Sequence, residues 1–365
     1  MTEKRLYLDV HVLQTLPPSN INRDDTGSPK TAYYGGVRRA RVSSQAWKRA
    51  IRKYFVEHGD EAAVGVRTKD IVRYVADKVR QLDPSYGEAD AMQGAEKAIN
   101  NAGIKTKDHK AKALFFMGDL QARELAGAVL AGKIEKSDMK DLQAALAASP
   151  EIDIALFGRM VADAPKLNTD ASCQVAHAIS THAVQTEFDY FTAVDDCLPE
   201  DQSGAGMLGN IEYNSSTLYR YANIAVHELR EQLGGKEASI NTCRLFIEAF
   251  SNSLPTGKVN TFANQTLPSF LMVTLREDRP VNLVSAFEKP VCSGQGQGYV
   301  NASVERLGVE YEKASKIVTR PLENLYLNLT EEAPGMEDGL ECQTLPELLD
   351  QAAQAIGRYL EEEGE

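Results

Sequence analysis

The chain has 365 residues, of which 43% are hydrophobic and 25% charged, and its formal net charge is −12 at pH 7. This composition is ordinary for a globular protein, and the length suits one elaborated domain or two modest ones. No apolar run approaches membrane-spanning length and no basic-then-apolar leader opens the sequence, so we expect neither a membrane span nor export. The five cysteines are scattered and include no Cys-x-x-Cys pair, which argues against disulfides and structural zinc and predicts reduced thiols in a cytoplasmic protein.

The first predicted elements are two strands separated by a long loop. Residues 6–13 alternate apolar and polar side chains, which is typical of a half-buried strand. Residues 17–29 are rich in turn-forming types and predict a loop, and residues 37–42 predict a short second strand.

A basic helix is predicted next, capped by Ser43 or Ser44 and running to Phe55. Residues 26–56 contain eight Lys or Arg and no Asp or Glu, although the whole chain is acidic. Charge concentrated in this way indicates one oriented polyanion site, with nucleic acid as the first candidate. A solvated helix face is the alternative, but helix amides beside neighbouring arginines favour a phosphate site. Trp47 lies on the apolar stripe of the helix, so we expect it to pack on a sheet rather than to stack on a base.

The middle of the chain is predicted to be helical and then mixed. Residues 60–150 are rich in Ala, Lys, Glu and Asp and indicate a helical subdomain inserted between β-rich parts. Its amphipathic stretches are residues 68–81, 88–101, 112–131 and 137–147. After it, residues 152–157 predict a strand and residues 172–186 a helix.

A hairpin arm and the remaining elements follow. Residues 188–194 and 211–224 predict strands joined by a polar linker. Residues 167–219 contain no Lys or Arg, so any contact of this arm with nucleic acid has to be made by apolar wedging or stacking. Further on, the sequence predicts helices at 226–233, 240–253 and 345–363 and a strand at 270–275. The glycine-rich residues 293–298 match no nucleotide-binding motif.

Two other groups of side chains have alternative interpretations. Asp24 and Asp25 lie in the loop after the first strand, where they either hold Mg²⁺ for phosphodiester cleavage or brace the loop by hydrogen bonds. His177 and His182 are five residues apart and do not share a helical face, which argues against a shared zinc. His177 is expected to be a core or hydrogen-bonded histidine.

Several motifs, in the same order along the chain, resemble the CasC family, the repeated backbone subunits of the type I-E CRISPR Cascade complex. The motifs span residues 22 to 289 of the sequence. They are Asn22-Arg-Asp-Asp25, Gly35-Gly36-x-Arg-Arg-x-Arg-x-Ser-Ser-Gln-x-x-Lys-Arg-Ala-x-Arg52, Asp153-Ile-Ala-Leu-x-Gly-Arg-Met160, Ala176-His-Ala-Ile179, Phe191-Thr-Ala-Val-Asp-Asp196, Tyr219-Arg-Tyr-Ala-Asn-Ile224 and Ala286-Phe-Glu-Lys289.

The resemblance implies an α+β fold with an RNA-recognition-like (ferredoxin-type) palm, an inserted helical fingers subdomain and a β-hairpin thumb. The implied boundaries are palm at 1–58, fingers at 59–150, palm at 151–186, thumb at 187–222, palm at 223–330 and a C-terminal helical tail at 331–365.

The resemblance also implies a non-catalytic scaffold without cofactor or metal. Copies of the chain would stack head-to-tail along one CRISPR RNA, beside other Cascade subunits, kink the guide and present it for pairing with target DNA. A recruited helicase-nuclease, an indirect partner, would cut that DNA. The alternative is a metal-dependent RNA endonuclease on the same fold that uses Asp24 and Asp25.

Matching motif positions and the basic pattern assign two sets of site residues. The set expected to hold RNA is Arg23, Lys30, Arg38, Arg39, Arg41, Ser43, Ser44, Gln45, Lys48, Arg49, Arg52 and Met160. The set expected to wedge against bases from the thumb is Phe191, Thr192, Val194 and Leu208.

Overall fold

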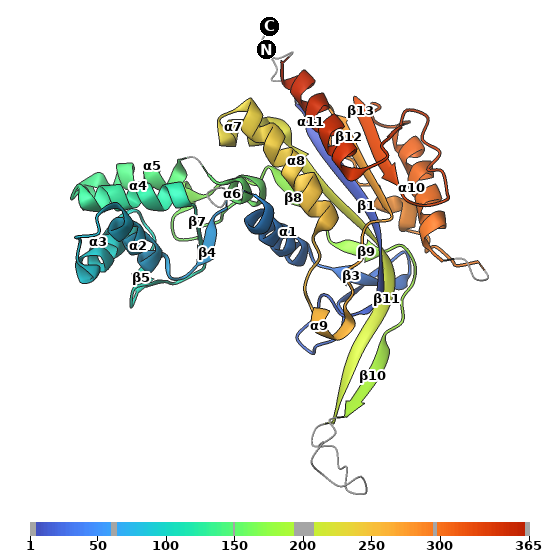
Figure 1. Cartoon of the computed structure of the whole chain (residues 1–365), viewed down its shortest axis with the longest axis horizontal. Coiled ribbons are helices and arrows are strands. Elements are labelled where there is room, and N and C mark those ends of the chain that lie inside the picture. The colour runs from blue at the N-terminus through green and yellow to red at the C-terminus, as the bar shows by residue number, and fades with distance from the viewer. Residues whose placement is uncertain (1–4, 60–63, 149, 193–207, 295–297, 362–365) are drawn as a thin grey trace, which may run out of the picture.

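The computed structural model describes residues 5–59, 64–148, 150–192, 208–294 and 298–361. These residues form a mixed α+β architecture around one large sheet (Figure 1), which confirms the predicted class. The sheet has the strand order β14-β13-β12-β1-β11-β9-β3-β2, and β8 and β10 also pair with β11. The bounds of its strands are β1 (Tyr7–Ser19), β2 (Thr31–Tyr34), β3 (Val37–Val42), β8 (Cys173–Val175), β9 (Ala178–Ser180), β10 (Glu187–Thr192), β11 (Leu208–Ala225), β12 (Phe270–Arg276), β13 (Glu323–Asn328) and β14 (Leu340–Glu341).

Strand β1 lies at the centre of the sheet, antiparallel to both β11 and β12. Its side chains alternate between two faces, as the pleat requires, and both faces are covered. The prediction of a half-buried strand was therefore wrong: Asp9 and His11 are as deeply buried as their apolar neighbours. Asp9 is tolerated there because Tyr221 and the Val281 amide donate hydrogen bonds to its carboxylate at 2.7 and 2.9 Å.

Helices cover both faces of the sheet. On one face Leu8 of β1 belongs to the same core as Ile51 and Phe55 of α1 and Phe246 of α8. The helices that contribute to this core are α1 (Ser44–His58), α6 (Ile152–Phe157), α7 (Val226–Leu233), α8 (Lys236–Asn252) and α11 (Leu345–Glu361). The other face packs on α10 (Val300–Ala314) and the 3₁₀ turn η5 (Val284–Phe287).

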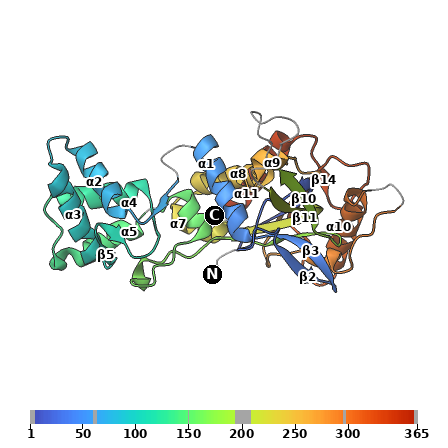
Figure 2. The ribbon, with the colours of Figure 1, turned by 90° about the horizontal axis from the view of Figure 1, so that it is seen from below.

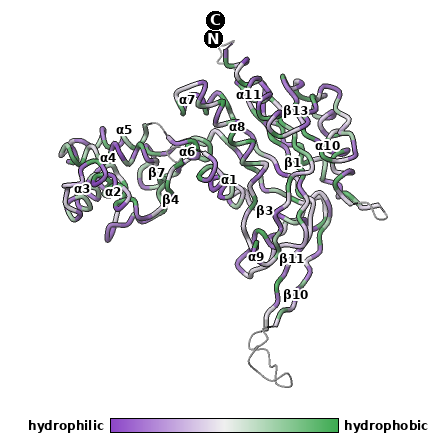
Figure 3. The backbone as a smooth tube through the Cα atoms, in the orientation of Figure 1, coloured by the Kyte–Doolittle hydropathy of each residue, from purple (hydrophilic) through white to green (hydrophobic). Residues whose placement is uncertain are grey.

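A helical subdomain extends from one side of the sheet (Figures 1 and 2) and has its own apolar core, built from residues 71–167. Hydrophilic and hydrophobic residues are interspersed along its helices (Figure 3), as in amphipathic helices around a small core. Its main elements are β4 (Val66–Thr68), α2 (Ile71–Leu82), α3 (Glu88–Asn101), β5 (Thr106–Lys107), β6 (Lys110–Ala111), β7 (Phe115–Met117), α4 (Asp119–Leu130), the 3₁₀ turn η2 (Lys136–Asp138), α5 (Met139–Ala147) and the 3₁₀ turn η3 (Pro165–Leu167).

Three secondary-structure predictions were wrong. Residues 152–157 form α6 rather than a strand, because a six-residue segment that is apolar except for Asp153 and mostly buried has no periodicity that separates the two states. Residues 172–186 form β8 and β9 rather than a helix, because each pairs with β11 in the sheet. In addition, residues 115–117 within the predicted helix 112–131 form β7, which pairs with β4.

A two-stranded ribbon projects away from the sheet (Figure 1). It consists of β10 and the first part of β11, paired from Glu187↔Tyr213 to Thr192↔Leu208. Every β10 side chain is exposed. The short helix α9 (Val259–Phe262) lies in the connection between α8 and β12. Of the helices that the structure describes, none has the length and apolar content needed to cross a membrane.

Candidate nucleic-acid grooves

The start of α1 is fixed by the loop that follows β1. The Ser43 hydroxyl accepts a long hydrogen bond of 3.4 Å from the Ala46 amide, and the Ser43 amide donates to Asn22 Oδ1 at 2.8 Å. Ser43 thus acts as the helix N-cap, as predicted from the sequence. Because Asn22 also belongs to the loop, the loop and the helix start are held together as one unit.

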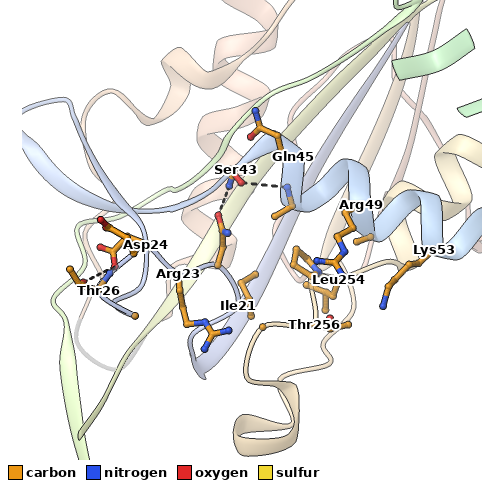
Figure 4. Close-up of a pocket in the computed structure, with 17 residues that line it drawn as sticks. Ile21, Arg23, Asp24, Thr26, Ser43, Gln45, Arg49, Lys53, Leu254 and Thr256 are labelled. Atoms are coloured by element: carbon orange, nitrogen blue, oxygen red, sulfur yellow. Dashed lines mark hydrogen bonds between the residues drawn. The ribbon is translucent and has the colours of Figure 1, made fainter. Parts of the chain in front are cut away.

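One groove, which we call groove A, lies between this loop, α1 and residues 254–257, with a volume of about 760 Å³. Arg23, on the loop, lies on one side of groove A, and Arg49 and Lys53, on α1, lie on the other (Figure 4). All three side chains are exposed. Among the residues that the structure describes, no carboxylate forms an ion pair with any of them. Groove A therefore presents to a polyanion three cations that have no ion-pair partner among the described residues, on a lining that also carries Asp24 and Asp25.

A second groove, groove B, is lined by α1, by Arg67 and Phe116 of β4 and β7, and by residues 157–160 and 168–171, with a volume of about 1050 Å³. Gln45 and Arg49 line both grooves, so the two meet along α1. Lys48 and Arg67 add positive charge, and Met160, 85% exposed, stands on the rim. Lys48 also lies over the ring of Phe157, with its Nζ 5.2 Å from the ring centroid. Groove B combines cations with apolar surface, which suits a strand with both phosphates and bases.

Arg39 is not available to nucleic acid, and its prediction as an RNA-binding residue was wrong. Its guanidinium is fully buried and donates to the carbonyls of Tyr34, Ser180, Phe287 and Glu288 at 2.7–3.2 Å. Burial lowers the pKa of this guanidinium. Arg39 therefore anchors the β2–β3 hairpin to the body of the protein.

The tip of that hairpin requires glycine at Gly35. Gly35 has φ +59°, and a Cβ there would lie 1.6 Å from the Glu288 carbonyl oxygen. The Arg39 anchor and this close approach fix the hairpin at the same place.

Arg52 lines groove B and is at the same time tied to its surroundings, so its assignment to RNA binding stays a prediction. Its Nε donates to Asp153 Oδ2 at 2.8 Å, one amino group donates to the Gly65 carbonyl at 3.0 Å, and the guanidinium lies 4.4 Å from the centroid of the Phe116 ring. Asp153 is fully buried and also accepts from the Gly65 amide. Burial raises the pKa of the Asp153 carboxyl, while the Gly65 amide and Arg52 lower it. Arg52 thus ties α1 to both connections between sheet and helical subdomain.

The remaining predicted basic residues lie on or just before the strands that precede α1, outside the linings of grooves A and B. Arg38 is exposed, with its guanidinium 5.9 Å from the centroid of the Tyr33 ring. Arg41 is half-buried and donates to the Thr31 carbonyl and to His177 Nδ1. Lys30 lines a small cavity together with Arg41. Ser44, the first residue of α1, is half-buried.

The projecting ribbon carries the predicted wedge residues as far as the structure describes them. Phe191 faces Gly209 on the paired strand, and its ring occupies the space of the missing side chain: a Cβ on Gly209 would lie 2.4 Å from Phe191 Cζ. Thr192 pairs with Leu208. Val194 lies outside the described residues. Phe188 and Tyr190, which the sequence analysis did not single out, are exposed together on the opposite face of β10; their spacing of two residues is the signal that identifies them.

Asp24 braces its own loop. Its Oδ1 accepts hydrogen bonds from the Thr26 amide at 2.9 Å, the Thr26 hydroxyl at 2.7 Å and the Ser28 amide at 3.0 Å. The Thr26 hydroxyl is the main cause of the lowered pKa of Asp24. Asp25 is exposed, and both carboxylates line groove A. Within the described part of the chain, no cluster of three His, Cys, Asp or Glu side chains has an arrangement suited to a metal ion.

Arg159 is a residue whose role the sequence analysis missed. It is buried and donates to the carbonyls of Leu167, Phe116 and Leu146 at 2.6–3.0 Å, and to Gln121 Oε1 at 2.9 Å. Burial lowers its pKa to about 10. Because Arg159 directly precedes Met160, these bonds fix the rim of groove B. The Gly-Arg-Met motif was visible in the sequence, but nothing in it distinguished the anchoring arginine from a surface one.

Comparison with known proteins gives consistent results. The family model for CT1975-like proteins matches residues 8–351. A solved chain titled "CRISPR RNA-guided surveillance complex, pre-nicking" is 29% identical, with a TM-score of 0.84, over 96% of this chain and 100% of that one. Another, titled "CRISPR RNA-guided surveillance complex", is 28% identical, with a TM-score of 0.73, over 96% of this chain and 99% of that one. No curated protein sequence matches.

Proposed function

The chain belongs to the CT1975-like protein family, and we propose that it is a CRISPR RNA-binding subunit of a Cascade-type surveillance complex. More closely, we propose the CasC role: the repeated, non-catalytic backbone of a type I-E complex in the cytoplasm. The titles and full-length coverage of the two similar solved chains support membership of such a complex. The single observation that carries RNA binding is the pair of grooves that meet along α1 and gather exposed cations such as Arg23 and Arg49 in an otherwise acidic protein.

The sheet topology supports an RNA-recognition-like palm. Strands β12, β1, β11 and β9 are neighbours in that order, each antiparallel to the next. Helix α1 follows β1, and α8 lies between β11 and β12. This is the 4-1-3-2 strand order of a ferredoxin-type fold, with the helices on one face. In this interpretation the helical subdomain is the fingers and the β10–β11 ribbon is the thumb.

The grooves favour binding of a nucleic-acid backbone without sequence preference. Their cations Arg23, Arg49 and Lys53 are long, exposed side chains suited to phosphates, and phosphate contacts carry no sequence information. A subunit that serves every guide requires this property. Sequence reading then comes from pairing between the guide and target DNA.

Several copies bound head-to-tail along one guide would multiply the affinity of each site by avidity. Since each copy carries net charge −12, we expect assembly of the copies to depend on RNA. Complete nuclease digestion should therefore disperse the particles, as measured by light scattering. Defined particles that survive digestion would contradict RNA-dependent assembly.

The loop geometry supports a scaffold over an endonuclease. Asp24 Oδ1 already accepts three hydrogen bonds from its own loop, which leaves its Oδ2 and the exposed Asp25 as the carboxylate oxygens for Mg²⁺. The proposal predicts that the complex leaves complementary RNA intact in Mg²⁺. Regularly spaced cuts that disappear in Asp24→Asn would instead establish the endonuclease.

The direct test is to express the whole complex and extract its nucleic acid. We expect a discrete RNA of uniform length to co-purify with the chain. Recovery of the assembled complex without RNA would refute the proposed function.

A further inference from the structure

Next to groove A, three basic side chains from different elements come together. Lys30 precedes β2, Arg41 lies on β3, and His177 lies between β8 and β9. Arg41 donates from a terminal amino group to His177 Nδ1 at 3.1 Å. We call this group the Lys30–Arg41–His177 cluster. The sequence analysis assigned His177 no more than a packing or hydrogen-bonding role.

The hydrogen bond with Arg41 determines the tautomer of His177. A guanidinium is always a donor, so His177 Nδ1 has to accept, and the ring is neutral with its proton on Nε2. His177 is exposed. Its Nε2–H is therefore a donor beside two cations, at a position open to solvent.

The positive charges of the cluster have no carboxylate partner among the described residues. Among the described residues, no carboxylate pairs with Lys30 or Arg41. Arg41 and Lys30 are the charged groups that the structure places close enough to act on His177. Burial is the first cause of the lowered pKa of His177, and the charges of Arg41 and then Lys30 lower it further. Like charges held together at a solvent-exposed site are stabilised by an anion.

The backbone connects the cluster to groove A. The Lys30 amide donates to the Asn22 carbonyl, and the Arg41 amide donates to the Lys30 carbonyl, both at 2.9 Å. Asn22 in turn holds the amide of the helix cap Ser43 and lines groove A. A strand that leaves groove A past the start of α1 therefore passes next to the cluster.

We propose that the Lys30–Arg41–His177 cluster binds a phosphodiester of the nucleic-acid strand, with His177 Nε2 as one donor, and that proton uptake by His177 tightens this binding. The inference rests on the proposed function, since it concerns the same bound strand. Its ligand is the phosphate group rather than any base.

The direction of the pH effect follows from the charges. In the free protein, burial and then the charges of Arg41 and Lys30 disfavour the imidazolium of His177. The proton is taken up at Nδ1, where it replaces the hydrogen bond that this atom accepts from Arg41. A bound phosphate adds negative charge and raises the pKa of His177. The affinity for RNA therefore begins to increase when the pH falls through the pKa of His177 in the RNA-bound protein. It stops increasing once the pH is below the lower pKa of His177 in the free protein. Each unit between the two pKa values is about a tenfold change in affinity.

The test uses the purified full chain and a short fluorescent single-stranded RNA, with anisotropy measured at constant salt from pH 8 to pH 5.5. We expect wild-type affinity to rise by roughly threefold to tenfold as the pH falls. His177→Gln keeps an N–H donor but cannot take up a proton, so its affinity should stay flat from pH 8 to pH 5.5. His109→Gln, an exposed histidine of the helical subdomain paired with Glu96, is the matched control and should keep the wild-type rise.

The other outcomes have separate meanings. If His177→Gln shows the same rise as wild type, the inference fails while the proposed function stands. If its affinity falls equally at every pH, His177 only braces Arg41, and the inference is again overturned. If the wild-type chain binds no RNA at any pH, the proposed function fails as well.

Discussion

The α1 helix and the β10–β11 ribbon are both exposed, but they differ in charge and in support. Helix α1 is packed on the sheet through Trp47, Ile51 and Phe55 and presents cations to grooves A and B. In the ribbon, by contrast, every side chain of β10 is exposed. Residues 167–219 contain no Lys or Arg. One region is therefore suited to hold phosphates, and the other to contact bases by shape.

Removing the groove cations should have the largest effect. The triple variant Lys48→Ala, Arg49→Ala, Lys53→Ala removes two exposed charges and the half-buried Lys48, and no ion pair of the described residues. We expect guide recovery from the complex to be lost. For the isolated chain, the slope of log affinity against log salt should fall by about 2, since each phosphate contact on a single strand contributes about 0.7.

The control for the groove variant is Lys313→Ala, Lys316→Ala, which removes exposed lysines at the end of α10, far from both grooves. It should leave guide recovery and the salt slope unchanged. Equal losses in both variants would mean that net charge, rather than the grooves, determines RNA binding. A loss confined to certain guide sequences would contradict backbone recognition.

Arg49 and Arg52 offer a sharper comparison within one helix. Arg49 is exposed in both grooves, whereas Arg52 pairs with the buried Asp153. Arg52→Ala leaves that carboxylate without its cation, a change that typically costs about 3 kcal/mol or more. Because Arg52 is itself partly exposed, we expect the lower end of that range, measured by urea denaturation. Arg49→Ala should weaken RNA binding and leave the free energy of unfolding within about 0.5 kcal/mol of wild type.

Arg49 and Arg52 also show which properties of α1 could be predicted from the sequence and which could not. Both lie on a helix whose cap, apolar stripe and approximate length were correctly predicted, because each signal is local. What makes Arg52 structural is Asp153 and Gly65, which come from other parts of the chain and meet it only in the folded protein.

The same limit applies on β3. Arg38 and Arg39 are adjacent and identical in type, and alternation predicts only that they face opposite sides. The carbonyls of Phe287 and Glu288, nearly 250 residues away, decide that Arg39 is the anchor. The errors at residues 152–157 and 172–186 have a related cause: in short apolar segments, pairing with β11 or burial against helices outweighs local pattern.

The smallest expected effect lies in the ribbon. Phe191 is 36% exposed, and its ring covers Gly209 on the paired strand. If the ring contacts a base, Phe191→Ala should lower RNA affinity by about 1–2 kcal/mol, typical of one aromatic–base contact. The salt slope should stay the same, because no phosphate contact is lost. An RNA with an abasic position at the contact should bind wild type and variant equally. Phe188→Ala, on the opposite face of β10, is the matched control. A fall in the salt slope of Phe191→Ala would show that the ribbon contributes electrostatically after all and would remove the distinction between it and α1.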